Sequence, residues 1–320
     1  MALSWTFLTQ TARQSGTRKS PASAEEPLPR RVARARLAAP PYVLGMGDKS
    51  KISVTLSGVP ETLLWTLYHR AQEAARPEAV LHDPLAVELV RRIDYPFEER
   101  LGQGVHLEQW QGLRARTFDQ AVTRFLSTNP AGTVVALGEG LETQFWRVDN
   151  GQVRWLGVEL PEAASVRHQV LPGHERHRQL DVSALEEAWM NEVDPTLGVL
   201  ITAQGLLMYL HRDQVHDLLI RCAQRFPGAQ LVFDGVPRWT SAVTQKQLKP
   251  AEGRVPAPPM PWPMDHREAA ALRALPGIRS IERLHPPRGR GVLYSYLLPL
   301  VDRLPLVRSL VLSIWSVRFE

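Results

Sequence analysis

The stretch Thr133-Val-Val-Ala-Leu-Gly-Glu-Gly-Leu-Glu-Thr-Gln-Phe-Trp146 decides the fold. It opens with a short apolar run rich in β-branched residues, which is typical of a buried parallel strand. The run ends at Gly138 and Gly140, and a helical pattern follows. Glycine lets the backbone come close to a ligand, and a helix N-terminus offers free N–H groups. The stretch therefore predicts a nucleotide-binding turn, although a plain strand-to-helix connection gives the same pattern.

A second predicted strand, Val153-Arg-Trp-Leu-Gly-Val-Glu159, ends in an acid. A carboxylate at this place is positioned to accept hydrogen bonds from ribose hydroxyls. Thr143 stands where a dinucleotide-binding motif has its third glycine. The pattern therefore favours a ligand of mononucleotide size, such as S-adenosylmethionine.

Strand and helix patterns alternate from residue 133 to residue 235. Such alternation predicts a Rossmann-like α/β fold, a mostly parallel sheet with helices on both faces. Three helical patterns precede it, at 60–75, 83–92 and 105–128, and predict an N-terminal helical cap over 46–128. The core is then expected to cover 129–320.

The overall charge of +5 comes from one part of the chain. Residues 1–45 carry a net charge of +5, whereas the other residues hold 31 basic and 31 acidic side chains. The body of the protein therefore has no bulk charge that favours nucleic acid. The single cysteine fits a reducing compartment, and we expect a cytoplasmic protein.

Residues 1–45 are rich in Ser, Ala, Pro and Arg and are expected to be disordered. Their composition up to Ala24 resembles an organelle transit peptide. A start of translation at Met46 is the interpretation we favour, because regular patterning begins only after it.

The proline-rich segment 236–264 predicts a lid-like insertion, although a plain surface excursion gives the same composition. A helix over 265–275 and strands over 277–284 and 291–298 are expected to follow. The apolar tail 297–314 is interrupted by charges and by Pro305, so it is too short for a membrane span. We expect an amphipathic helix that packs on the body or on a second subunit in a homodimer, with attachment to a membrane surface as the alternative.

No cysteine or histidine cluster predicts a metal site. His174 and His177 lie three residues apart, but in a loop-like stretch rich in Arg and His.

The glycine stretch resembles the motif of the leucine carboxyl methyltransferase family. The similarity is greater to its bacterial branch, which contains O-methyltransferases of polyketide biosynthesis. Four further blocks occur in family order: Asp83-Pro-Leu-Ala86, Arg116-Thr-Phe-Asp119, Val158-Glu-Leu-Pro161 and Leu200-Ile-Thr-Ala-Gln-Gly-Leu-Leu-Met-Tyr-Leu210. The resemblance implies a class I methyltransferase with a seven-stranded sheet, an antiparallel last strand and S-adenosylmethionine as cofactor.

The resemblance also implies cofactor-binding residues. Arg116 is expected to pair with the cofactor's carboxylate, and Gln204 to lie beside its amino end. The remaining expected contacts are Gly138 and Gly140 at the methionine part, Glu159 at the ribose and Asp181 at the adenine.

Structural roles remain open for several of these positions. Arg116 can be a surface helix residue, Asp181 a helix cap and Gln204 a hydrogen-bonding group at the end of a strand. The family usually has Asp where Glu142 and Glu159 stand, and often Glu where Gln204 stands. A non-catalytic protein that binds S-adenosylmethionine therefore remains an alternative, as does a nicotinamide-dependent oxidoreductase.

The resemblance favours a carboxylate of a small, polyketide-type molecule as methyl acceptor. A carboxylate is ionised at neutral pH and needs no general base. A phenol or hydroxyl acceptor needs one, and Asp265 or His266, next to the predicted lid, are the candidates.

Overall fold

The computed structural model describes residues 51–54, 61–246, 255–304 and 308–320. The expectations for residues 1–45 lie outside these ranges. All described residues belong to one compact unit, Asp48–Glu320. The helices before residue 129 are part of that unit, so the boundary between cap and core stays a prediction.

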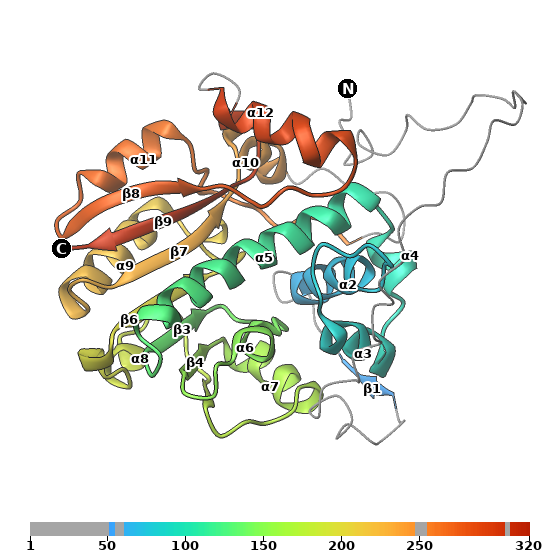
Figure 1. Ribbon diagram of the computed structural model, residues 1–320, viewed down its shortest axis with the longest axis horizontal. Coiled ribbons are helices and arrows are strands. Elements are labelled where there is room, and N and C mark those ends of the chain that lie inside the picture. The colour runs from blue at the N-terminus through green and yellow to red at the C-terminus, as the bar shows by residue number, and fades with distance from the viewer. Residues whose placement is uncertain (1–50, 55–60, 247–254, 305–307) are drawn as a thin grey trace, which may run out of the picture. The chain divides into compact units, whose positions relative to one another are not determined.

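A seven-stranded sheet forms the centre of this unit (Figure 1). Its order is β5-β4-β3-β6-β7-β9-β8. The first five strands in this order are parallel to one another, and β9 is antiparallel to both of its neighbours. This confirms the predicted fold class and its antiparallel last strand. The strands are β3 (Thr133–Leu137), β4 (Arg154–Val158), β5 (His177–Leu180), β6 (Val199–Ala203), β7 (Gln230–Gly235), β8 (Ile278–Leu284) and β9 (Ser313–Phe319).

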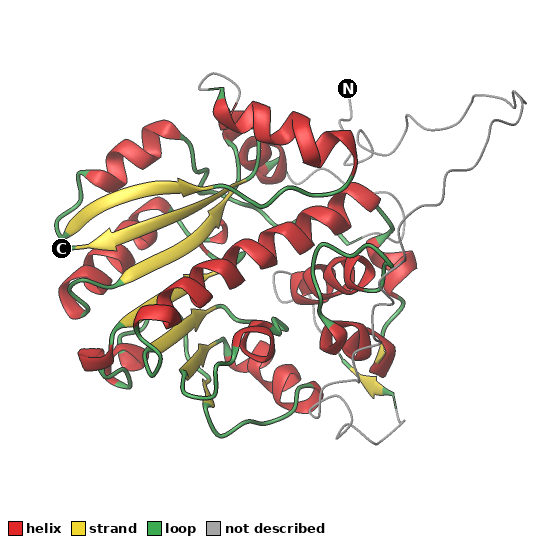
Figure 2. Cartoon of the chain, in the orientation of Figure 1, coloured by secondary structure: helices red, strands yellow, loops and turns green. Residues whose placement is uncertain are grey.

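Helices cover both faces of the sheet, as Figure 2 shows in red. On one face, α9 (Arg212–Arg225) and α11 (His266–Arg273) pack their apolar side chains into the main core. The long helix α5 (Val105–Thr128) crosses the other face (Figure 1). Shorter helices fill the connections: α6 (Gln144–Val148), α7 (Pro161–Val170), α8 (Ala188–Asn191), α10 (Arg238–Gln245) and α12 (Leu298–Arg303).

The N-terminal helices form where the sequence predicts them. They are α2 (Thr62–Ala74), α3 (Pro84–Arg92), the short α4 (Phe97–Leu101) and α5, with a two-stranded sheet of β1 (Ile52–Ser53) and β2 (Ile93–Asp94). Asp83 starts α3, because its side chain accepts a hydrogen bond from Ala86 N at 3.1 Å. Pro84 supplies the first helical residue, where its missing N–H costs nothing.

The C-terminal part differs from the sequence prediction. Residues 291–298 are not a strand, because Leu293–Leu297 form a π-helix that leads into α12. Within the tail predicted as a helix, 297–314, α12 is helical over Leu298–Arg303, and β9 begins at Ser313 and fits between β7 and β8. Ile314 and Val317 are fully buried there, and β9 satisfies strand edges that would otherwise stay unpaired.

None of the helices in the described part of the chain has the length and hydrophobicity that crossing a membrane requires. The same residues contain no group of three or more His, Cys, Asp or Glu side chains that could hold a metal ion.

Candidate cofactor site at the carboxyl ends of the strands

The glycine turn after β3 has the geometry of a cradle. Gly138 and Gly140 have φ angles of 62° and 52°, in the left-handed region that glycine adopts without strain. A Cβ on Gly138 would lie 3.0 Å from Leu206, and a Cβ on Gly140 would clash with Leu63 of α2. Because the two glycines lack a Cβ, other groups can approach the backbone of the turn closely. In this structure the side chains of Leu63 and Leu206 occupy that space.

Glu159 lies beside this turn, directly after β4. Its side chain accepts hydrogen bonds from Gly140 N at 2.7 Å and from Leu160 N at 2.8 Å. Burial raises the pKa of this carboxyl group, and the two backbone N–H groups only partly oppose the rise. The structure thus brings Glu159 and the predicted glycines together at one edge.

Gln204 follows β6 at the same edge. Its Nε2 donates to Glu142 Oε2 at 3.2 Å, while its buried Oε1 has no hydrogen-bond partner among the described residues. An unpaired buried acceptor is costly, so this oxygen suits a ligand that brings a donor.

Two arginines of α5 lie in different environments. Arg116 is exposed, and the one hydrogen bond of its side chain to another described residue goes to Val80 O at 3.4 Å. Arg114 is 5% exposed and reaches the carboxyl ends of β6 and β7. Its Nε forms an ion pair with Asp234 at 2.8 Å, with an angle unsuitable for a hydrogen bond, and its Nη1 donates to Gln111 at 2.7 Å.

Arg114 also lies against the turn after β6. Its Nη2 lies 2.7 Å from the place that a Cβ on Gly205 would take, and Gly205 N donates to Asp234 at 2.6 Å. The geometry therefore favours Arg114, and not the predicted Arg116, as the arginine of this edge. The helical periodicity of the sequence could have identified Arg114, because it lies on the same face of α5 as the buried residues Thr117, Phe118 and Ala121.

Asp181 follows β5, the strand next to β4. Leu180 O accepts a hydrogen bond from Glu159 N at 3.1 Å, so Asp181 belongs to the same edge of the sheet. Its side chain is exposed and contacts His168 at 3.3 Å. Asp181 is thus at the rim of the site, where a role in adenine binding stays a prediction.

A buried network of charges joins the glycine turn to the N-terminal helices. Arg147 of α6 binds three carboxylates: Asp83 at 2.9 Å, Asp119 at 2.8 Å and Glu142 at 2.7 Å. Arg70 of α2 adds bonds to Asp83 and Glu142. Glu142 is five residues from Arg147, but Asp83 and Asp119 are 64 and 28 residues away, so the spacing in the sequence does not indicate the network.

The edge is closed in this structure. The space between the glycine turn, Gln144, Trp155 and Gln204 is about 10 Å³, which suits a single water molecule. A nucleoside therefore requires side chains such as Leu63 and Leu206 to move aside. The residues nevertheless fit a nucleoside cofactor chemically, since the turn offers backbone N–H groups, Glu159 a carboxylate and Gln204 an unpaired acceptor.

Replacing Gly140 by Ala is expected to weaken the binding of S-adenosylhomocysteine, the demethylated cofactor. The left-handed conformation also costs alanine roughly 1–2 kcal/mol of folding stability. Titration calorimetry and urea unfolding measure the two effects. Gly151→Ala is the matched control, because Gly151 has a φ of 81° and nothing within 4 Å of an added Cβ. Equal cofactor affinity in the two variants would contradict the assignment of the cradle.

The sheet order, the glycine cradle and the acid after β4 are those expected of a class I S-adenosylmethionine-dependent methyltransferase. The family description "Leucine carboxyl methyltransferase" matches residues 64–223, half of the chain. The protein belongs to the leucine carboxyl methyltransferase family.

Two relatives support the family assignment. The tetracenomycin polyketide synthesis O-methyltransferase TcmP of Streptomyces glaucescens is 34% identical over 189 residues, which is 59% of this chain and 70% of TcmP. The S-adenosyl-L-methionine-dependent methyltransferase dpfgK of Gibberella zeae is 33% identical over 194 residues, which is 56% of this chain and 64% of dpfgK.

Proposed function

We propose that the protein transfers the methyl group of S-adenosylmethionine to a carboxylate oxygen of a small, polyketide-type molecule. The observation that carries the proposal is the edge formed by the glycine turn, Glu159 and Gln204, in a chain of this family. The family name supports a carboxyl group as acceptor, and the name of TcmP supports a polyketide.

The ribose and the amino-acid end of the cofactor each have a partner of matching chemistry at this edge. Glu159 holds the ribose hydroxyls by accepting their hydrogen bonds. Gln204 Oε1, which is buried and unpaired, accepts from the ammonium group. Arg114 takes the role predicted for Arg116 and binds the carboxylate, because it is the buried arginine beside Gly205. Bound in this way, the cofactor supplies an electrophilic methyl carbon.

The remaining work of the protein is to align the acceptor oxygen and to exclude water. A carboxylate brings its own negative charge, so no proton has to be removed. Asp265, the candidate base for a phenol, is already committed: its side chain caps α11 through Arg267 N and Glu268 N and binds Arg238. Burial raises the pKa of Tyr209 to about 12, so its hydroxyl stays protonated at neutral pH. The commitment of Asp265 favours a carboxylate over a phenol, and His266, the other candidate base, is an exposed residue at the start of α11.

A test of the acceptor class uses wild-type protein, labelled S-adenosylmethionine and a panel of aromatic carboxylic acids paired with the corresponding phenols. We expect methylation of acids only. The product must release its label as methanol in alkali, because a methyl ester is hydrolysed there and an aryl methyl ether is not. An alkali-stable product would contradict the carboxylate assignment, and cofactor binding without turnover on any acceptor would favour a non-catalytic binding protein.

Replacing Glu159 by Gln is expected to lower the affinity for S-adenosylhomocysteine about tenfold to a hundredfold. A hydrogen bond to a charged group contributes about 1.5–3 kcal/mol, and each 1.4 kcal/mol is a factor of ten. Titration calorimetry measures the change. Glu162→Gln is the control, since Glu162 is an exposed acid in the first turn of α7. Unchanged affinity in Glu159→Gln would remove Glu159 from the cofactor site.

The assembly and location of the protein are further parts of the proposal. Exposed apolar side chains near α12, including Tyr296 and Leu300, support a homodimer through this surface, and the single cysteine supports a cytoplasmic location. Light scattering of the purified chain measures the mass, and a monomer mass would exclude the homodimer.

A further inference from the structure

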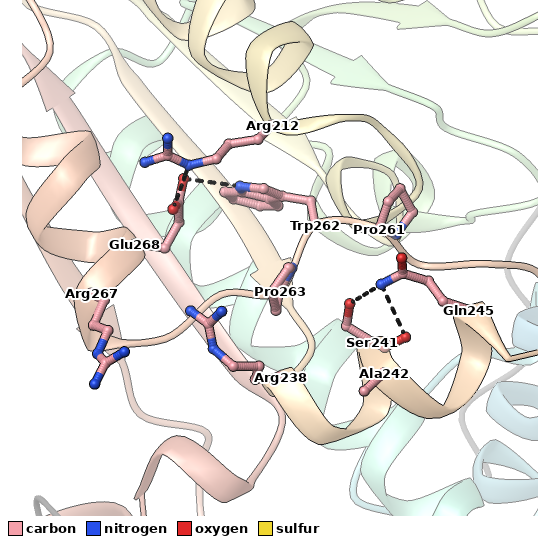
Figure 3. Close-up of a pocket in the computed structure, with 10 residues that line it drawn as sticks. All are labelled: Arg212, Arg238, Ser241, Ala242, Gln245, Pro261, Trp262, Pro263, Arg267 and Glu268. Atoms are coloured by element: carbon pink, nitrogen blue, oxygen red, sulfur yellow. Dashed lines mark hydrogen bonds and ion pairs between the residues drawn. The ribbon is translucent and has the colours of Figure 1, made fainter.

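A second and larger pocket lies beside α10 and α11. Its volume is about 530 Å³, within the range of pockets that hold small molecules. It shares no residue with the space at the glycine turn. Figure 3 shows its lining residues, which are Arg212, Arg238, Ser241, Ala242, Gln245, Pro261, Trp262, Pro263, Arg267 and Glu268.

Three arginines contribute positive charge to this pocket. Arg212 pairs with Glu268 at 2.9 Å, and Arg238 pairs with Asp265 at 2.8 Å. Both arginine side chains are about 60% exposed, so their guanidinium groups can also reach a ligand. Arg267 adds a third guanidinium. With three cations against these two carboxylates, the pocket keeps a positive charge.

Helix stability does not explain these arginines. Each lies in the first turn of a helix: Arg212 in α9, Arg238 in α10 and Arg267 in α11. The first turn favours acidic side chains, because the helix dipole is positive there. The ion pairs with Glu268 and Asp265 account for Arg212 and Arg238, and an anion bound in the cavity would balance the remaining charge, that of Arg267.

The apolar part of the pocket lining includes Trp262 and two prolines. The Trp262 ring is buried, and its Nε1 donates to Glu268 Oε1 at 3.1 Å. Pro261 and Pro263 flank it, as Figure 3 shows. Gln245 also lines the pocket, and its Nε2 donates to Ser241 Oγ at 2.9 Å. A flat apolar body with an acidic group at its end matches this combination.

The pocket is linked to the proposed methyl-transfer edge by short pieces of chain. Arg238 comes four residues after Asp234, the partner of Arg114, so their Cα atoms are at most about 14 Å apart. Arg212 follows the half-buried Tyr209 by three residues. Trp262 N donates to Met208 O at 3.4 Å, which ties the pocket lining to the turn after β6. The chain therefore places Arg238 within about 14 Å of Asp234, a separation that an elongated molecule can cover.

We infer that this pocket holds a second acidic group, at the far end of the methyl acceptor. The acceptor class is then an elongated aromatic molecule with two anionic ends, one methylated at the sheet edge and one held by Arg238 and Arg267. The inference rests on the proposed function, because it assigns the pocket to the acceptor of that reaction.

The test compares two probes that differ by one anionic group. One is a naphthalene dicarboxylate whose carboxylates lie at opposite ends of the ring system, and the other is the corresponding monocarboxylate. Titration calorimetry with the full chain, with and without saturating S-adenosylhomocysteine, gives both affinities. We expect the diacid to bind about tenfold more tightly, as one additional charge-assisted hydrogen bond allows.

Variants locate the source of this preference. In Arg238→Gln and Arg267→Gln the diacid is expected to fall to the affinity of the monoacid, with the affinity for S-adenosylhomocysteine unchanged. Arg279→Gln is the charge-matched control, because Arg279 is exposed at the start of β8 and outside the pocket. It should keep the tenfold preference.

Three results would overturn the inference: no diacid binding at millimolar concentration, equal binding of both acids by the wild type, or a preference that survives in both pocket variants. Failure of the proposed function looks different. In that case S-adenosylhomocysteine does not bind, while the preference for the diacid and its loss in the variants remain measurable.

Discussion

Arg114→Ala is expected to lower the affinity for S-adenosylhomocysteine at least about thirtyfold, whereas Arg116→Ala leaves it unchanged. Arg114 is buried beside Gly205, where it can meet the carboxylate of the cofactor, and Arg116 points to Val80 O on the surface. Removing one partner of a buried, hydrogen-bonded charge pair costs about 2–5 kcal/mol. Titration calorimetry on the two variants measures the difference directly.

The Arg114 result requires a control for folding, because the variant also leaves Asp234 without its partner. Arg114→Lys keeps the charge but loses the planar fork of the guanidinium group, so it should fold and bind with intermediate affinity. Loss of binding in Arg116→Ala with full binding in Arg114→Ala would reverse the assignment and restore the prediction made from the sequence.

Arg147→Ala is expected to lower the free energy of unfolding by about 3–5 kcal/mol. The substitution leaves Asp119 without its arginine, while Asp83 and Glu142 keep their ion pairs with Arg70. Removing one partner of a buried ion pair has costs of this size. Urea unfolding measures the change. Arg154→Ala is the control, since Arg154 is largely exposed and its contact with Asp194 is 3.7 Å long. It should stay within about 1 kcal/mol of the wild type.

The same network makes the stability of the fold depend on pH. Burial acts to raise the pKa of Asp83, but Arg147 and Arg70 outweigh it and hold this pKa below its usual range. A carboxyl group with a lowered pKa stabilises the fold above its unfolded pKa of about 4, and the contribution is lost as the pH falls through the folded pKa. Arg147→Ala should therefore unfold at a higher pH during acid titration. An unchanged acid midpoint, or equal stability of Arg147→Ala and Arg154→Ala, would contradict the role of the network.

The α/β core was predictable from local pattern. The strands β3, β4, β6 and β7 are apolar runs bounded by turn residues, and their alternation with helices permits few other folds. The C-terminus was not, because β9 owes its conformation to β7 and β8 on either side of it. An apolar segment by itself does not tell a strand from a helix, and the partners that decide lie outside the local sequence.

The candidate site was predictable where it depends on neighbours in the chain. Gly138, Gly140 and Glu159 could be found from the spacing of strand, turn and acid. In the structure the two glycines lie in one turn, and Gly140 N donates a hydrogen bond to Glu159. Choosing between Arg114 and Arg116 required knowing which face of α5 packs on the sheet. The apolar residues of α5 mark that face in the sequence, and Arg114 lies on it.

Other features depend on tertiary structure alone. The partners of Arg147 come from α3, α5 and the glycine turn, and the second pocket joins the starts of α9, α10 and α11. Residues 236–264 were predicted as a lid, and the described part contains α10 and a bridge from Val236 to Pro263. The role of this segment as a lid stays a prediction.

The most direct test of the central claim is a crystal structure of the full chain with S-adenosylhomocysteine. We predict the ribose hydroxyls at Glu159, the amino group at Gln204 Oε1 and the carboxylate at Arg114, with Leu63 and Leu206 moved away from the glycine turn. Density for the ligand at another place, or a turn still closed by Leu63 at saturating ligand, would contradict the assignment of this edge as the cofactor site.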